Sequence, residues 1–282
     1  MNFLEMNTDL LLEYIWVPIL APAFIYLIKF LFFDKLLYVK EIKKITDNDI
    51  AQFTELYNNR IDDTLKICVE EILQFVGKSS NSSIEHHLYI CKKINKTVGF
   101  MKFMISKEHK YIFVAYVAID NSDKAALEYG MKTLIKTLAK KYFNPRVATC
   151  IITEVEESPN GSHRNAMSLL VSRYAKSLGK KCYYVDIPYI QPQMPDDHNT
   201  QTDEQFLALL YIPFYEKANN CMPRNDVLSI IKSIYFDIYA PSCDPSLGCD
   251  CESYNRYLSR IITMYHDTDE FVNLIPIGRH SN

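Results

Sequence analysis

The chain has 282 residues, of which 48% are hydrophobic and 23% are charged, so its composition is that of an ordinary folded protein with a core. The formal net charge of −3 gives no electrostatic reason to expect nucleic acid as a partner. Aromatic residues recur at strand-like spacing rather than among basic runs, which also argues against a nucleic-acid-binding surface.

The first predicted unit, residues 1–35, is a hydrophobic helix. Its segment "LLLEYIWVPILAPAFIYLIKFLFF" (10–33) approaches the length of about 20 apolar residues that spans a bilayer. Lysines follow on its C-terminal side, so an anchor here would leave the rest of the chain in the cytoplasm. The alternative is a helix that lies on a membrane surface or packs on the folded domain, bent at Pro18 and Pro22. We expect membrane association through this helix.

The next segments predict one strand, two helices and three further strands. "LLYVKEIK" (36–43) alternates apolar and charged residues, as a strand does, and amphipathic helices are predicted over 46–60 and 62–77. The hydrophobic period then changes to two, with tight polar turns between the runs. The predicted strands of this antiparallel meander are "HLYICKK" (87–93), "VGFMKFMIS" (98–106) and "YIFVAYVAI" (111–119).

The second half alternates helices and strands before a polar insert and a tail. Helices are predicted over 124–142 and 163–179, and strands over 146–156, 181–190 and 206–214. Two amphipathic helices are predicted in the tail, around "CDPSLGCDC" (243–251). Because these cysteines lack the paired spacing of a zinc site, we expect no metal. The predicted units are therefore a domain over 36–216 and a C-terminal helical extension over 217–282.

This order of elements resembles the GCN5-related N-acetyltransferase (GNAT) superfamily over roughly residues 36 to 216. "KKINKTVGFMKF" is similar to the family's second and third strands, and "YVAID" to the end of its fourth strand. "SRYAKSLGKKCY" is similar to the helix that precedes the sixth strand. The resemblance implies an α+β (α/β/α) fold in which helices flank a mixed, mostly antiparallel sheet. The hydrophobic N-terminal helix and the C-terminal helical extension are additions to that fold.

The resemblance also implies a cosubstrate, acetyl-CoA or another acyl-CoA, and an amine as acceptor. In the family, the pantetheine arm pairs with the backbone of the fourth strand, and the pyrophosphate binds the amides that open the next helix. The family's loop there reads Arg/Gln-x-x-Gly-x-Gly/Ala, whereas this chain has one glycine and a loop that is a residue or two longer. The cofactor-binding residues that the resemblance implies are Val117, Ala118, Ile119, Lys124, Tyr129, Gly130, Met131 and Asn165.

The predicted catalytic base is a glutamate at the end of a core strand. In "CIITEVEE", period two places Glu154 and Glu156 on one face with Cys150 and Ile152. Carboxylates are unusual in such a strand, since burial without a partner is unfavourable and raises the pKa. Glu154 is the deeper candidate base. The alternative is that the strand emerges into solvent there and both acids are surface charges.

The candidate for the general acid is Tyr174. The resemblance places a tyrosine four residues before the glycine that ends the helix, and Tyr174 lies one residue away from that position relative to Gly179. A tyrosine packed in the core is the alternative. The sequence as a whole predicts a membrane-associated N-acyltransferase. A catalytically inactive GNAT-like binding module, tethered to the membrane, is the other hypothesis.

Overall fold

The computed structural model describes ten segments of the chain, 37–43, 47–61, 69–76, 83–122, 126–156, 166–191, 205–215, 220–240, 251–264 and 270–277. The described strands are β1 (Leu37–Glu41), β2 (Ile84–Lys93), β3 (Lys96–Ser106), β4 (Tyr111–Ile119), β5 (Cys150–Glu156), β6 (Tyr183–Val185), β7 (Tyr189–Gln191), β8 (Gln205–Pro213), β9 (Cys221–Pro223) and β10 (Phe271–Pro276). The described helices are α4 (Asp47–Arg60), α5 (Val69–Gln74), η4 (Ala126–Gly130), α6 (Met131–Tyr142), α7 (Ala166–Ser177), α8 (Arg224–Ser233), η5 (Ile234–Tyr239) and α9 (Cys251–Met264). Both η4 and η5 are π-helical.

One sheet forms the centre of the fold. Its strands follow the order β1-β2-β3-β4-β5-β8-β6-β10-β9, and β7 pairs with β8 beside this path. The pair β4 and β5 is parallel, while the other pairs of described strands are antiparallel. The predicted mixed, mostly antiparallel sheet is therefore confirmed, and so is the chain order of its strands through β5.

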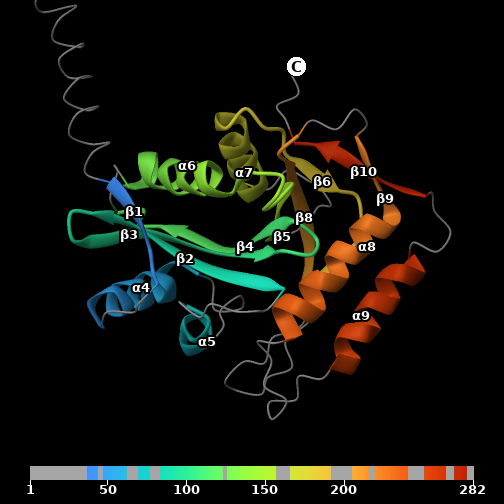
Figure 1. Ribbon diagram of the computed structural model, residues 1–282, viewed down its shortest axis with the longest axis horizontal. Coiled ribbons are helices and arrows are strands. Elements are labelled where there is room, and N and C mark those ends of the chain that lie inside the picture. The colour runs from blue at the N-terminus through green and yellow to red at the C-terminus, as the bar shows by residue number, and fades with distance from the viewer. Residues whose placement is uncertain are drawn as a thin grey trace, which may run out of the picture.

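Helices cover both faces of the sheet (Figure 1). On one face α6 and α7 pack on the strands, and α6 buries Met131, Leu134, Leu138 and Tyr142, which recur at helical spacing along one side. On the other face α4 packs on β3 and β4, while α8, η5 and α9 cover the half formed by β5, β8 and β10. The layered arrangement gives each face of β4 and β5 a different set of neighbours.

Two differences from the predicted elements concern strands. The predicted strand 181–190 is two strands, β6 and β7, because Pro188 lies between them and has no amide hydrogen for a ladder. The tail, expected to be helical, also contains β9 and β10. In "FVNLIP" of β10, Val272 and Leu274 are buried while Asn273 is exposed, which is the alternation of a strand. Its pairing with β6 could not be read locally, since the two strands are far apart in sequence.

The predicted N-terminal anchor, residues 1–35, lies outside the described residues. Among the residues that are described, no helix is both long enough and apolar enough to cross a bilayer.

Candidate active site

The feature that organises the site is a separation between the two parallel strands. β4 and β5 pair from Tyr111 with Cys150 to Val114 with Thr153. Beyond that point β4 continues to Ile119 and β5 to Glu156 without pairing to each other, while β5 stays paired with β8 over its whole length. Among the described strands, β4 therefore has an open edge in the middle of the sheet.

A bulge in β4 accompanies the separation. In the β3–β4 ladder, Lys102 is opposite Tyr116 and Phe103 is opposite Val114, so Ala115 has no partner on β3. An extra residue in one strand increases its local twist and bends it. The bulge lies directly after the last β4–β5 pair, and it therefore explains physically why β4 turns away from β5 there.

The open edge presents backbone groups of known direction. The amide of Asp120 donates to the carbonyl oxygen of Val98 on β3, 2.8 Å away. Because successive residues of a strand direct their peptide groups to opposite sides, Val117 and Ile119 direct their N–H and C=O groups away from β3, toward the gap. Of the predicted pantetheine-binding positions, Ala118 directs its peptide groups toward β3, and its side chain is buried against α4.

The helix that follows β4 begins with a π-helical turn, η4, over Ala126–Gly130. A π-turn closes a hydrogen bond over five residues instead of four, so it holds one residue more than an α-helical turn.

Close packing fixes the distance between this helix and the end of β4. A Cβ atom on Gly130 would lie 3.2 Å from Cδ1 of Ile119. A Cβ atom on Gly99 of β3 would overlap the same Cδ1 and would come within 3.2 Å of the Ala118 carbonyl oxygen. The two glycines therefore let Ile119 fit between β3 and the helix.

The predicted phosphate-binding residues take different places. Tyr129, Gly130 and Met131 lie about one turn inside the helical run, and the side chain of Met131 is buried in the core beneath α6. Lys124, the predicted cation, lies outside the described residues, as does Asn165. Of the predicted phosphate-binding residues that the structure describes, none carries a charged side chain.

A carboxylate lies where β4 ends. Asp120 accepts hydrogen bonds from the amide and the hydroxyl of Ser122, and it forms ion pairs with Lys96 at 2.9 Å and Arg60 at 3.0 Å. These hydrogen bonds, those from Ser122 first, hold the pKa of Asp120 well below its usual range. The ionised carboxylate thus ties α4, β3 and the start of the loop together.

Glu154 is the first residue of β5 after its pairing with β4 ends. Its side chain lies on the face covered by α8 and η5. One carboxylate oxygen accepts a hydrogen bond from the hydroxyl of Tyr189, and the other accepts one from the hydroxyl of Tyr239 at 2.5 Å. Burial raises the pKa of Glu154 to about 7, and the two hydrogen bonds oppose this rise. Near neutral pH the carboxyl group is therefore poised to accept or release a proton.

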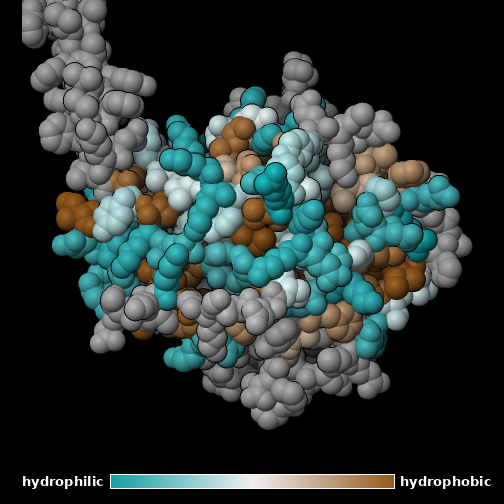
Figure 2. Space-filling view, in the orientation of Figure 1, coloured by the Kyte–Doolittle hydropathy of each residue, from teal (hydrophilic) through white to brown (hydrophobic). Residues whose placement is uncertain are grey.

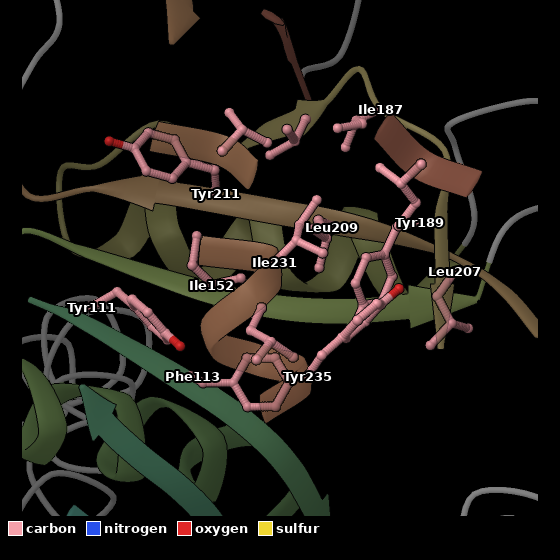
Figure 3. Packing of buried hydrophobic residues seen from close by; sticks show 14 of the residues in the cluster. Tyr111, Phe113, Ile152, Ile187, Tyr189, Leu207, Leu209, Tyr211, Ile231 and Tyr235 are labelled. Carbon is pink, nitrogen blue, oxygen red and sulfur yellow. The ribbon is translucent and has the colours of Figure 1, made fainter. Parts of the chain in front are cut away.

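Aromatic side chains surround this carboxylate. Tyr189 of β7 and Tyr235 of η5 pack with ring centroids 5.7 Å apart, as Figure 3 shows, and Tyr235 donates to the carbonyl oxygen of Ile190. Phe113 of β4 packs edge-on against Tyr239 at 6.3 Å. Burial raises the pKa values of Tyr189 and Tyr239 well above the usual value for tyrosine, so both hydroxyls stay protonated and donate. Figure 2 shows apolar side chains among hydrophilic ones on the visible face over β4 and β5.

The other two predicted catalytic residues lie apart from this cluster. Glu156 is exposed at the end of β5, on the same face as Glu154 but two residues farther along the strand. Tyr174 is half-buried in α7, among the side chains that pack on the opposite face of the sheet from Glu154, and burial raises its pKa. Within the described residues, the structure therefore brings Glu154 together with Tyr189 and Tyr239 rather than with Tyr174.

The sequence patterns around Tyr189 and Tyr239 only weakly indicate a role at the site. Tyr239 follows Tyr235 at helical spacing in "SIYFDIYA", a pattern that a packed core helix also produces. Tyr189 lies in an apolar run in which its strand period is interrupted by Pro188. Their convergence on Glu154 depends on β7 and η5 meeting β5, over separations of 35 and 85 residues.

The arrangement has the chemical parts of acyl transfer to an amine. An open strand edge can pair with an extended amide-containing ligand, as an added strand would. A carboxylate with a pKa near neutral pH can take a proton from an ammonium group. Among the described residues, no group of three or more His, Cys, Asp and Glu side chains lies close enough together to hold a metal ion.

Comparisons with known proteins find matches among solved structures alone. No protein-family model and no curated protein matches the sequence. Among solved structures, a GNAT-family chain from Bacteroides thetaiotaomicron is 16% identical, with a TM-score of 0.48, over 72% of this chain and 98% of its own. The ribosomal-protein-S18-alanine N-acetyltransferase of Escherichia coli is 12% identical, with a TM-score of 0.39, over 65% of this chain and 97% of its own.

A third match is Arabidopsis thaliana NAA60, whose structure contains acetyl-CoA. It is 11% identical, with a TM-score of 0.41, over 62% of this chain and 97% of its own. Solved GNAT acetyltransferases thus match this chain at low sequence identity.

Proposed function

We propose that this protein is an acyl-CoA-dependent N-acyltransferase, with acetyl-CoA as the expected donor, which transfers the acyl group directly to an amine. The observation that carries the proposal is the open edge of β4 beside Glu154. Past Val114, no described strand pairs with β4 on its β5 side, and Glu154 lies next to the gap with its pKa raised to about 7. An edge inside a sheet that is left unpaired invites an extended ligand.

The open edge suits the pantetheine arm of CoA, which is extended and carries two amide groups. These amides would pair with the peptide groups of Val117 and Ile119, while an amide near the bulge at Ala115 would polarise the thioester carbonyl. The pyrophosphate would bind near the start of η4, where the helix dipole is positive. These contacts use backbone groups, so they tolerate the loss of the family's glycines and arginine.

Glu154 would serve as the general base. The acceptor arrives as an ammonium ion, and Glu154 takes one proton so that the nitrogen lone pair can attack the thioester carbonyl. The tetrahedral intermediate then expels the thiolate, which takes the second proton lost by the nitrogen. A base with a pKa near 7 is efficient near neutral pH, because a useful fraction is ionised while its basicity is still high.

Residues 10–33 are proposed to hold this domain at a membrane.

An observation at Asp120 favours the alternative of an inactive binding module. Its carboxylate already accepts the Ser122 amide and pairs with Lys96 and Arg60. The carboxylate therefore already engages the cations of Lys96 and Arg60 close to the loop where the pyrophosphate would bind, and it neutralises part of the positive charge that would attract phosphates. A module that has lost its cofactor would retain the fold and this internal ion pair.

The two functions are separated by calorimetric titration of the full chain with acetyl-CoA and with CoA. We expect binding of both, and no heat at millimolar ligand would refute the acyltransferase proposal. The transfer step is then tested by chromatographic detection of CoA released from acetyl-CoA, with amino acids, polyamines and short peptides as amine probes. Glu154→Gln is expected to lower the release at least a hundredfold while leaving CoA affinity unchanged. Release at the wild-type rate would remove Glu154 from the role of base.

A further inference from the structure

We propose that Tyr239 and Tyr189 are positioning residues for Glu154, so that the C-terminal segment around η5 forms part of the active site. This inference rests on the proposed function. Tyr239 lies in residues 217–282, outside the part of the chain that carries the family resemblance. The C-terminal segment 217–282 would therefore contribute to catalysis by positioning Glu154.

The geometry is that of a carboxylate held on both oxygens. Oε2 of Glu154 accepts from Tyr239 at 2.5 Å and Oε1 accepts from Tyr189, so neither oxygen can rotate without breaking a hydrogen bond. The two donors come from separate elements, η5 and β7. Hydrogen bonds to a charged acceptor are stronger than those between neutral groups, so the pair fixes the orientation of the carboxylate.

The π-helical turn is what directs Tyr239 at Glu154. α8 runs as an α-helix to Ser233 and continues as the π-helix Ile234–Tyr239. The widened turn changes the direction of the side chains after it relative to a continuous α-helix. Phe113 packs against the Tyr239 ring, and the amide of Gln191 lies 3.4 Å from the Tyr239 hydroxyl. The tyrosine is thereby held from two sides.

Among the described residues, the titratable groups that interact with Glu154 or with its hydrogen-bond donors are tyrosines. They are Tyr189 from β7, Tyr235 and Tyr239 from η5, and Tyr116 of β4, which lies near Tyr239. Burial alone would keep Glu154 protonated at neutral pH, because desolvation disfavours the carboxylate. The two hydroxyl donors stabilise the ionised form. Removing one donor should therefore make Glu154 a stronger proton acceptor that is ionised only at higher pH.

The test is a carboxyl titration of the full chain by NMR, with ¹³C-labelled glutamate and Glu154→Gln to assign the signal. Tyr239→Phe is expected to raise the titration midpoint of Glu154 by about one pH unit, the value of one hydrogen bond to a charged group. Tyr189→Phe should act in the same direction. Tyr235→Phe is the matched control, because it removes a buried hydroxyl of the same π-helix that donates to Ile190 and not to Glu154.

The rate of CoA release with the best amine probe supplies the second readout. In Tyr239→Phe it should fall about tenfold at a pH below the midpoint and recover above it. A midpoint that stays at the wild-type value, or moves downward, in both Tyr239→Phe and Tyr189→Phe would overturn the inference, and so would an equal shift in Tyr235→Phe. If wild-type protein transfers no acetyl group, the proposed function fails, while the titration still decides whether the tyrosines control Glu154.

Discussion

The raised pKa of Glu154 has a measurable consequence for stability. The folded state holds the proton of this carboxyl group up to a pH of about 7, whereas the unfolded chain releases it near pH 4.5. The folded state is therefore favoured by this group at low pH, and the contribution is lost as the pH rises through 7. One pKa unit corresponds to about 1.4 kcal/mol, so the contribution changes by about 2.5 kcal/mol between pH 5 and pH 8.

The perturbation that isolates this contribution is Glu154→Gln, which keeps the shape of the protonated side chain and removes its titration. Urea unfolding of the wild type and the variant, at pH 5 and pH 8, gives four free energies of unfolding. The variant should gain about 2.5 kcal/mol relative to the wild type on going from pH 5 to pH 8, because all other groups titrate in both proteins. A difference between the two proteins that is the same at both pH values would refute the raised pKa and weaken the case for Glu154 as a base.

Three further outcomes are expected. Gly99→Ala should lower the free energy of unfolding, measured in urea, by about 1–3 kcal/mol, because the added methyl group overlaps Ile119. It should also weaken acetyl-CoA binding in calorimetry. An unchanged urea midpoint of unfolding would contradict the close packing. Asp120→Asn should lower the free energy of unfolding by about 1–2 kcal/mol at pH 7. This loss should disappear as the pH falls below the range where the Asp120 carboxylate is ionised, and a pH-independent loss would argue against an ionic cause. Alkaline carbonate extraction of expressing cells should leave the chain in the membrane pellet; release of the intact chain would rule out a spanning anchor at 10–33.

Much of the fold was readable from local patterns. The change from helical to strand periodicity located β2, β3 and β4, and the amphipathic run after them located α6, with Met131, Leu134 and Leu138 on its buried side. β10 was missed although Val272 and Leu274 alternate with polar or exposed neighbours, because six residues of alternation are weak beside two long helical patterns. Pairing between strands that are far apart in the sequence cannot be recognised from the residues of either strand alone.

The candidate site was likewise predictable from the sequence only in part. An acid at the end of an otherwise apolar strand was enough to single out Glu154, since a carboxylate in such a place needs a partner or a function. The partners were beyond reach of the sequence, because Tyr189 and Tyr239 meet Glu154 only when β7 and η5 fold onto β5. The separation of β4 from β5 was equally hidden, since it depends on the unpaired Ala115 in a ladder with β3.

By itself, then, the sequence determined the strands and helices from β1 to α7 and the residue of β5 that is unusual in a core, since hydrophobic period and local composition encode these properties. The tertiary structure decided where the sheet opens, which peptide groups line the opening and which hydroxyls hold Glu154. These depend on register and on contacts between segments far apart in the chain. In this protein, these long-range contacts bring Tyr239 of the C-terminal segment to the carboxylate of Glu154, which the strand pattern had already singled out.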